Sequence, residues 1–278
     1  MNQPLPASPR FDSNRAWQEA SGAVNANRDA LIALAGVFLA LPAFALAVLL
    51  PQPEPQPDAD MDAAMELAAL YFQENWLPLL ALGLLSTIGS MAMLTLFGHA
   101  SRPTVGDAIR KGLAATPIAI LAQMIVGLVM TGLILAPIGL AATGSKAIGA
   151  IGLILGIALG SWFWIRTCLT TPIIAAESLR NPLAAVQRSF LLTKGNAGRV
   201  LLFLFLLVLA FVIAGEVLQL AVSLLVQLAA GPQAGTITGA LIASMVQAAM
   251  AVYLSAALVA SYRQLGAASG APGAHPFG

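Results

Sequence analysis

The sequence predicts an all-α polytopic membrane protein with six transmembrane helices, and three observations support this prediction. Of the 278 residues, 59% are hydrophobic and only 9% are charged, whereas a soluble domain carries about 25% charged residues. Six apolar runs are each long enough to cross a hydrocarbon core, which takes about 20 helical residues. Nearly all Lys and Arg residues lie between alternate runs. This composition excludes a soluble enzyme and a disordered chain.

The six apolar runs are uninterrupted, which predicts helices, because a membrane β-strand has only about 10 residues and alternates in polarity. The polar first 28 residues are too long for the basic start of a signal peptide, so we expect the first run to be retained as a span. Pro42 predicts a kink within it. The predicted spans are Ala30–Leu50, Leu77–Gly98, Pro117–Leu140, Ala147–Ile165, Val200–Leu228 and Ile237–Tyr262.

Basic residues predict the orientation of the spans. Twelve of the thirteen Lys and Arg residues lie in alternate connecting segments, and only Lys146 lies on the other side. The segment 51–76 has six acidic residues and no basic one. The positive-inside rule therefore places both termini in the cytoplasm and 51–76 outside. We expect a cytoplasmic segment 1–28 with an amphipathic helix, a six-helix transmembrane domain 29–262, and a disordered cytoplasmic tail 263–278.

The segments on the predicted cytoplasmic side resemble one another. Ala16-Trp17-Gln18 followed by Asn27 matches Ala185-Val186-Gln187 followed by Asn196 at a constant offset of 169, and Ala108-Ile109-Arg110 is a looser match with a shorter gap to Pro117. This predicts a threefold repeat of a short amphipathic helix, an outgoing span and a returning span; chance similarity between juxtamembrane helices is the alternative. Apolar faces that can lie at the headgroups are predicted at Trp17, Ala20 and Val24, at Val105, Ala108 and Ile109, and at Leu183, Val186 and Phe190.

The segment between the fourth and fifth runs carries a more specific pattern. It contains Arg166, Pro172 and Glu177, followed by the stretch from Pro182 to Asn196, PLAAVQRSFLLTKGN. This pattern resembles the glycerophosphoryl diester phosphodiesterase membrane-domain family and related uncharacterised six-span proteins of the bacterial inner membrane. The resemblance implies an inner-membrane module. Some family members carry a fused soluble phosphodiesterase domain; since only 16 residues follow Tyr262, the resemblance implies a membrane module without that enzyme.

One acidic residue, Glu216, lies within a predicted span and is a functional candidate by default. Glu216, Gln219, Ser223 and Gln227 share one face of a helix, and we call them the polar stripe. Two interpretations stay open. The polar stripe lines a path for a transported solute or proton, or it lies at the outer interface or hydrogen-bonds to neighbouring helices.

Other residues in the spans predict helix packing. Gln123 and Gln247 are expected to hydrogen-bond between helices. Gly152, Gly156 and Gly160, together with Gly149, lie four or three residues apart on one face of the fourth span, where small residues let helices approach closely. Homodimerisation through that face is the alternative. Similar packing faces are predicted at Ala119, Gln123, Gly127 and Thr131, and at Gly83, Ser86, Thr87 and Ser90.

Basic residues near the fourth and fifth spans are candidates for contact with lipid. Arg166 follows Trp162 and Trp164, a combination that is typical of anchoring at the headgroups. We call Arg166, Arg180, Arg188, Lys194 and Arg199 the basic cluster; it is a candidate for binding anionic headgroups. Orientation alone also accounts for these charges.

The inventory of reactive residues predicts that the chain is not an enzyme. The two histidines, His99 and His275, are far apart in sequence, the single Cys168 has no neighbouring histidine, and no second carboxylate accompanies Glu216 in a span. No metal, cofactor or nucleic-acid partner is expected, the last because the net charge is only +1. The predicted function is a structural or accessory inner-membrane module that contacts the bilayer and binds anionic lipids or another membrane protein. The alternative is a small transporter or channel that uses the polar stripe. The oligomeric state cannot be read from the sequence.

Overall fold

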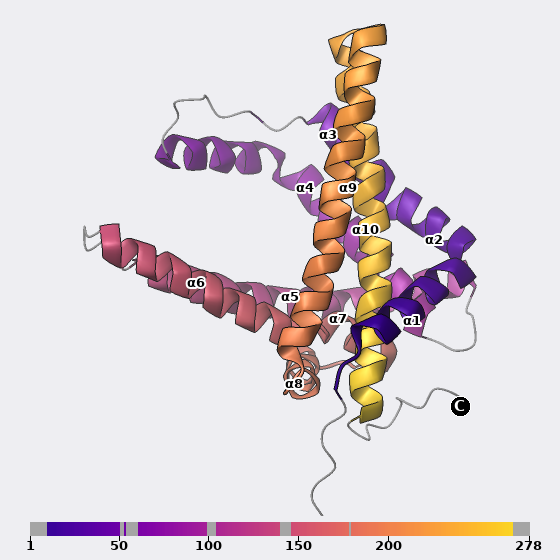
Figure 1. The fold of residues 1–278 in the computed structure, drawn as a ribbon, viewed down its shortest axis with the longest axis vertical. Helices are drawn as coiled ribbons and strands as arrows, with labels where there is room; N and C mark the ends of the chain where they lie inside the picture. The colour runs from indigo at the N-terminus through magenta and orange to yellow at the C-terminus, as the bar shows by residue number, and fades with distance from the viewer. Residues whose placement is uncertain are drawn as a thin grey trace, which may run out of the picture. The chain divides into compact units, whose positions relative to one another are not determined.

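The structure is a computed structural model, which describes residues 10–50, 53, 61–98, 104–139, 146–177 and 179–268 (Figure 1). This part of the chain is almost entirely helical and contains no strand, and six of its helical segments are long and apolar enough to cross a membrane. The predicted all-α polytopic fold is therefore confirmed. The elements are α1 (Ser13–Ala26), α2 (Arg28–Ala35), the π-helix η1 (Gly36–Ala40), α3 (Leu41–Leu49), α4 (Met61–Gly98), α5 (Val105–Ile138), α6 (Lys146–Thr167), α7 (Thr170–Glu177), α8 (Pro182–Leu192), α9 (Ala197–Ala230) and α10 (Pro232–Ala268).

The chain divides into two compact units. Unit 1 comprises Met1–Ala26, Met91–Leu206 and Tyr253–Gly278, and unit 2 comprises Asn27–Ser90 and Leu207–Val252. The long helices α4, α9 and α10 each contribute one part to unit 1 and another to unit 2. At a rise of 1.5 Å per residue, each of these helices is more than about 50 Å long, so its two ends pack against different parts of the chain.

The first span contains the distortion that Pro42 predicts. Proline lacks a backbone N–H and its ring clashes with the carbonyl group one turn earlier. The structure accommodates this with η1, in which the N–H of Leu41 donates to the carbonyl oxygen of Gly36, five residues back. Single π-turns of this kind widen the helix locally.

The acidic segment that was expected outside is helical from Met61 onward. It is continuous with the second span in α4, but the backbone leaves helical geometry at Asn75, where φ is −113° and ψ is 16°. The side-chain amide of Asn75 donates to the carbonyl oxygen of Tyr71 at 2.9 Å, and the Tyr71 hydroxyl donates to that of Leu50 at 3.0 Å. Pro78 follows within one turn of Asn75 and cannot donate to the helix ladder, which explains why the break lies here.

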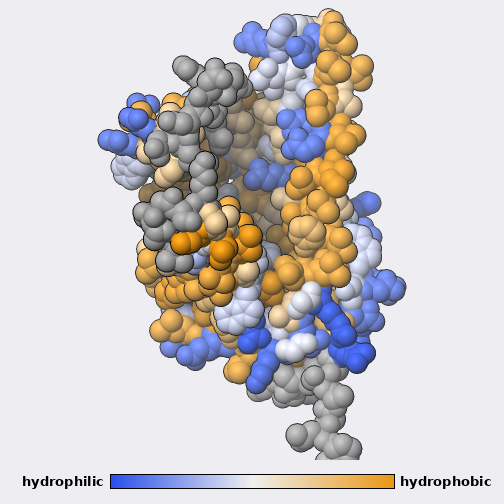
Figure 2. All heavy atoms as spheres, turned by 60° about the vertical axis from the view of Figure 1, so that its left-hand side comes forward, coloured by the Kyte–Doolittle hydropathy of each residue, from blue (hydrophilic) through white to orange (hydrophobic). Residues whose placement is uncertain are grey.

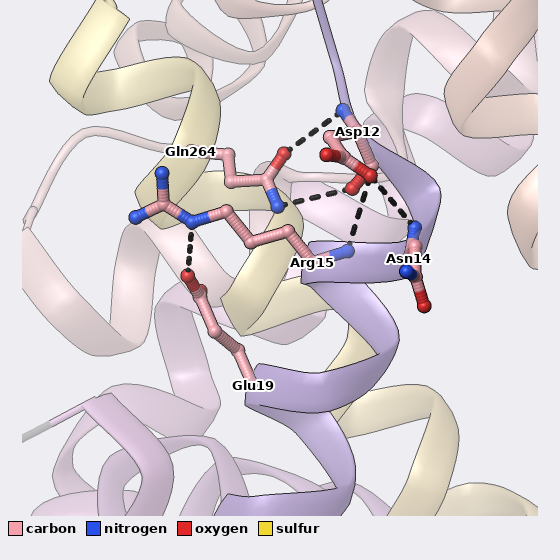
Figure 3. Close-up of polar contacts among 5 residues, drawn as sticks. All are labelled: Asp12, Asn14, Arg15, Glu19 and Gln264. Carbon is pink, nitrogen blue, oxygen red and sulfur yellow. Dashed lines mark hydrogen bonds and ion pairs between the residues drawn. The ribbon is translucent and has the colours of Figure 1, made fainter.

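Helix α10 extends beyond the predicted end of the sixth span, so the boundary at residue 263 was wrong for the six residues up to Ala268. These residues are held by side-chain contacts within unit 1. Arg263 donates to the carbonyl oxygen of Phe97, and Gln264 exchanges two hydrogen bonds with the backbone of Asp12 (Figure 3). The rest of the predicted tail, 269–278, lies outside the described residues.

The short helices α1 and α8 bury mainly small residues against the protein. Helix α1 buries Ala16, Ala20 and Val24, while Trp17 stacks on Tyr253 and stays partly exposed. Helix α8 buries Ala185, Ser189 and Leu192, while Leu183 of the face predicted to lie at the headgroups is 53% exposed. Small side chains let a short helix lie close to its neighbours, which leaves the larger apolar groups on the outer surface.

Burial follows the predicted repeat. Five positions that are buried in the first copy are also buried 169 residues later in the third copy: Ala16, Ala20, Val24, Leu31 and Leu34 correspond to Ala185, Ser189, Thr193, Val200 and Phe203. In both copies, Val24 and Leu31, or Thr193 and Val200, lie seven positions apart across the join between short helix and span. In the middle copy the corresponding residues, Thr116 and Ala119, are only three apart, and α5 runs through both without a break. The middle copy thus lacks a separate amphipathic helix.

Much of the visible surface is hydrophobic, as Figure 2 shows. The large exposed side chains are mostly Leu, Ile, Val, Met and Trp from the six spans. An apolar surface of this extent is incompatible with water and fits contact with lipid chains.

Candidate functional site

Three members of the polar stripe pack against α10 within unit 2. A methyl group added at Gly235 would lie 2.7 Å from Cβ of Gln227 and 2.9 Å from the carbonyl oxygen of Ser223. One added at Gly239 would lie 3.4 Å from Cβ of Ser223 and 3.8 Å from Cγ of Gln219. The glycines of α10 therefore make room for these polar side chains of α9, and the two helices run side by side (Figure 1).

Glu216 is not part of that contact. Its neighbour Gly215 faces Val246 of α10 closely, whereas the Glu216 side chain is exposed. No hydrogen bond or ion pair to Glu216 is found among the described residues. The four residues that the sequence placed on one face thus divide into three that contact α10 and one that does not.

The two glutamines predicted to join helices are both exposed. Gln123 belongs to unit 1 and Gln247 to unit 2, and within the described residues neither makes a hydrogen bond. A methyl group added at Gly127, one turn from Gln123, would meet no atom within 4 Å. The packing face predicted along Ala119, Gln123, Gly127 and Thr131 was therefore wrong beyond Ala119. The same holds for Gly83, which meets no neighbour, whereas Gly89 faces Phe38 closely.

The glycine face of α6 lies against α5 in unit 1. Gly152, Gly156 and Gly160 are all buried. A methyl group added at Gly156 would lie 2.8 Å from the carbonyl oxygen of Ile134, and one at Gly160 would lie 2.9 Å from the Ile134 side chain. These glycines allow the backbones of α5 and α6 to approach closely, and the two helices lie side by side (Figure 1).

The basic cluster divides into different environments. The guanidinium carbon of Arg166 lies 5.2 Å from the centre of the Phe190 ring, a cation–π contact. Arg188 is paired with Glu177, while Lys194 and Arg199 are exposed. Arg180 is exposed and lines a cavity. The five residues therefore do not form one binding surface.

Glu177, which ends α7, has partners on two other helices of unit 1. Its Oε1 atom accepts from Nε of Arg188 at 2.6 Å and from the Tyr262 hydroxyl at 2.7 Å. Glu177 therefore links α7, α8 and α10. Glu177 and Arg188 both belong to the pattern on which the family resemblance rests, but their pairing is not visible in the sequence.

Ser189 is a second linking residue that sequence analysis missed. It is fully buried on α8, and its hydroxyl donates to the carbonyl oxygen of Arg166 at 2.8 Å and accepts from the Leu169 N–H at 3.2 Å. These two groups flank the turn between α6 and α7, where helical hydrogen bonds are interrupted. Ser189 thus satisfies backbone groups that a helix break leaves open.

A cavity of about 370 Å³ lies between α4, α5 and the segment that contains α7, all in unit 1. We call it the Lys111–Arg180 cavity after the two charged residues that line it. Both side chains are exposed, and within the described part of the chain neither makes an ion pair. A neighbouring cavity of about 310 Å³ is lined by Glu177, Tyr262 and Arg263.

Lys111 occupies a position that recurs in the repeat. The predicted alignment of Ala16, Ala108 and Ala185 places Glu19, Lys111 and Arg188 at the same position. Glu19 accepts from Nε of Arg15 at 2.8 Å, as Figure 3 shows, and Arg188 donates to Glu177 at 2.6 Å. The first and third copies thus neutralise this charge within the protein.

No constellation of reactive groups is present among the described residues. They contain no group of three His, Cys, Asp or Glu side chains that is able to hold a metal ion. Cys168 follows α6 and is partly buried. His99 and His275 lie outside the described residues.

No family model, no curated protein and no solved structure matches this chain.

Proposed function

We propose that this chain is a non-enzymatic membrane module with a structural or accessory role. The observation that carries the proposal is that the polar stripe packs between helices. Its residues Gln219, Ser223 and Gln227 lie against Gly235 and Gly239 of α10. Polar side chains at such positions strengthen helix association in lipid. The charged residues of unit 1 support the same conclusion, since Glu177 and Arg188 join short helices to one another.

Localisation in a bacterial inner membrane is part of the proposal and rests on the resemblance of the segment from Arg166 to Asn196. The structure of that segment supports a structural role for its residues, because Arg188 pairs with Glu177, and Ser189 and Phe190 both contact Arg166. With both termini in the cytoplasm, single cysteines replacing Asp60 and Ser101 in a Cys168→Ser background should react with an impermeant reagent from opposite sides. Reaction from the same side would refute this orientation.

The alternative function is a small transporter or channel, and the observation that favours it is Glu216, whose exposed carboxyl group has no partner among the described residues. The test uses proteoliposomes loaded with a pH-sensitive dye and given a membrane potential. We expect the parent and Glu216→Gln to show the same proton flux as empty liposomes. A flux that is present in the parent, and is lost in a Glu216→Gln variant of unchanged thermal stability, would replace our proposal with the transporter.

The absence of enzymatic activity is tested separately. Purified protein should not release glycerol phosphate from glycerophosphodiesters, with or without divalent cations. Release above that of a heat-denatured sample, retained after repurification, would show that the chain is an enzyme.

A further inference from the structure

The inference concerns the Lys111–Arg180 cavity and does not depend on the proposed function. At Glu19 and at Arg188 the protein supplies the opposite charge itself, through Arg15 and Glu177. At Lys111 the described residues supply none. The middle copy therefore places a cation where the third copy has a complete ion pair.

The second cation of the cavity increases this imbalance. Arg180 lines the same cavity as Lys111, and no acidic side chain is among the described residues that line it. The nearby acid Asp107, one turn before Lys111, is engaged elsewhere. Its carboxylate accepts a hydrogen bond from the Thr104 hydroxyl at the start of α5, and its Oδ1 lies 3.8 Å from Nη2 of Arg110. Two like charges facing one space repel each other, so an anion between them would lower the energy of both.

The other lining residues indicate the kind of anion. Ala114, Ala115, Ile118 and Ile174 give the cavity an apolar wall beside the two cations. A volume of about 370 Å³ lies in the range of small-molecule sites, roughly 300–1,000 Å³. Arginine and lysine together are a common combination for phosphate, since arginine presents a fork of donors and lysine a point charge.

We propose that the Lys111–Arg180 cavity binds a phosphate group, which neutralises Lys111 as Glu177 neutralises Arg188. The apolar wall suits a phosphate ester that carries an apolar portion. Two sources share this chemistry, the headgroup of an anionic phospholipid and a soluble phosphate ester. The site differs from the predicted basic cluster because Lys111 was not part of it and because Arg188, Lys194 and Arg199 do not line the cavity.

The test measures binding by the full-length protein in maltoside micelles, which contain no phosphate. The probes are short-chain phosphatidylglycerol and inorganic phosphate, titrated separately and followed by calorimetry. The test variant is Lys111→Gln/Arg180→Gln. The matched control, Lys194→Gln/Arg199→Gln, removes the same charge from exposed residues outside the cavity.

We expect the parent to bind phosphatidylglycerol and the test variant to bind it at least about tenfold more weakly, with the control within about twofold of the parent. Binding of phosphatidylglycerol but not inorganic phosphate assigns the site to a lipid; comparable binding of both assigns it to a soluble ester. The proposal is overturned if neither probe binds the parent, or if the control loses as much affinity as the test variant. Should the double variant fail to fold, Lys111→Gln alone and the charge-conserving Lys111→Arg supply the same comparison.

Discussion

The second and third copies of the repeat place a basic residue at the same position and surround it differently. In the third copy, Arg188 is paired with Glu177, which also accepts from Tyr262, so a separate short helix is tied to α7 and α10. In the middle copy, Lys111 lies on an unbroken helix and faces an open cavity.

The two copies differ in how the short helix is connected to the following span, and this explains why only the third copy needs an ion pair. In the third copy α8 ends at a turn that contains Gly195, whose φ of +81° suits glycine. Because this turn interrupts the helical hydrogen bonds, the orientation of α8 relative to the span α9 is not set by the backbone. Side-chain contacts such as the Arg188–Glu177 ion pair must therefore hold α8 in place. The middle copy lacks this turn, and α5 fixes the direction of its first two turns by itself. The charge at Lys111 is then not needed for folding.

The largest loss of stability is expected for a substitution in the middle copy, at Gly112. It is equivalent to Ala20 and Ser189, but a methyl group there would lie 2.6 Å from the backbone nitrogen of Ala92. Because a backbone cannot move aside as a flexible side chain can, Gly112→Ala should lower the free energy of unfolding by about 2–3 kcal/mol, as measured by SDS titration of mixed micelles. The control Gly127→Ala, on the same helix with no atom within 4 Å, should not destabilise. Equal stability of both variants would show that α4 and α5 do not approach as described.

A smaller loss is expected when the ion pair of the third copy is broken. The side chains of Arg188 and Glu177 are 29% and 17% exposed, so Arg188→Gln should lower the free energy of unfolding by about 2 kcal/mol, less than for a fully buried pair. Arg199→Gln, which removes an exposed charge, should change it by less than about 0.5 kcal/mol. A double-mutant cycle with Glu177→Gln measures the coupling, and additive effects would mean that the pair contributes nothing.

The smallest of the three structural losses is expected at Ser189. Replacement by alanine removes the bonds to Arg166 and Leu169 and leaves a buried N–H without its partner, which costs about 1 kcal/mol. Ser21→Ala on α1, where the hydroxyl donates only to carbonyl oxygens of its own helix, should have almost no effect. Hydrogen exchange at Leu169 gives an independent check, because its amide should exchange faster in Ser189→Ala than in the parent.

The sequence predicted the spans and the repeat because both depend on local composition. Runs of apolar residues are visible without knowledge of the fold, and the offset of 169 was carried by short matches such as Ala16 with Ala185. It did not predict α7, since Pro172 and a length of eight residues give neither a span nor an amphipathic period. The buried face of α8 was also missed, because alanine and serine carry little hydropathy signal, whereas Ala20 and Val24 of the buried face of α1 were named as apolar positions.

The candidate site was predicted less well because charge pairing is a tertiary property. Arg188 and Arg180 look alike in the sequence, yet only one has a carboxylate beside it. Likewise, helical periodicity placed Glu216 on the same face as the rest of the polar stripe, but the glycines of α10 lie against Gln219, Ser223 and Gln227 and not against Glu216. Helical spacing defines a face but not which part of it a neighbour covers.

The most direct test compares Lys111→Gln with Arg188→Gln in the presence and absence of phosphatidylglycerol. Without the lipid, Lys111→Gln should change the free energy of unfolding by less than about 0.5 kcal/mol, and Arg188→Gln should lower it by about 2 kcal/mol. Phosphatidylglycerol should stabilise the parent and Arg188→Gln but leave Lys111→Gln much less stabilised, because a ligand stabilises only the folded state that binds it. If both variants lose the same stability without the lipid and respond equally to it, the two copies do not differ as the structure indicates.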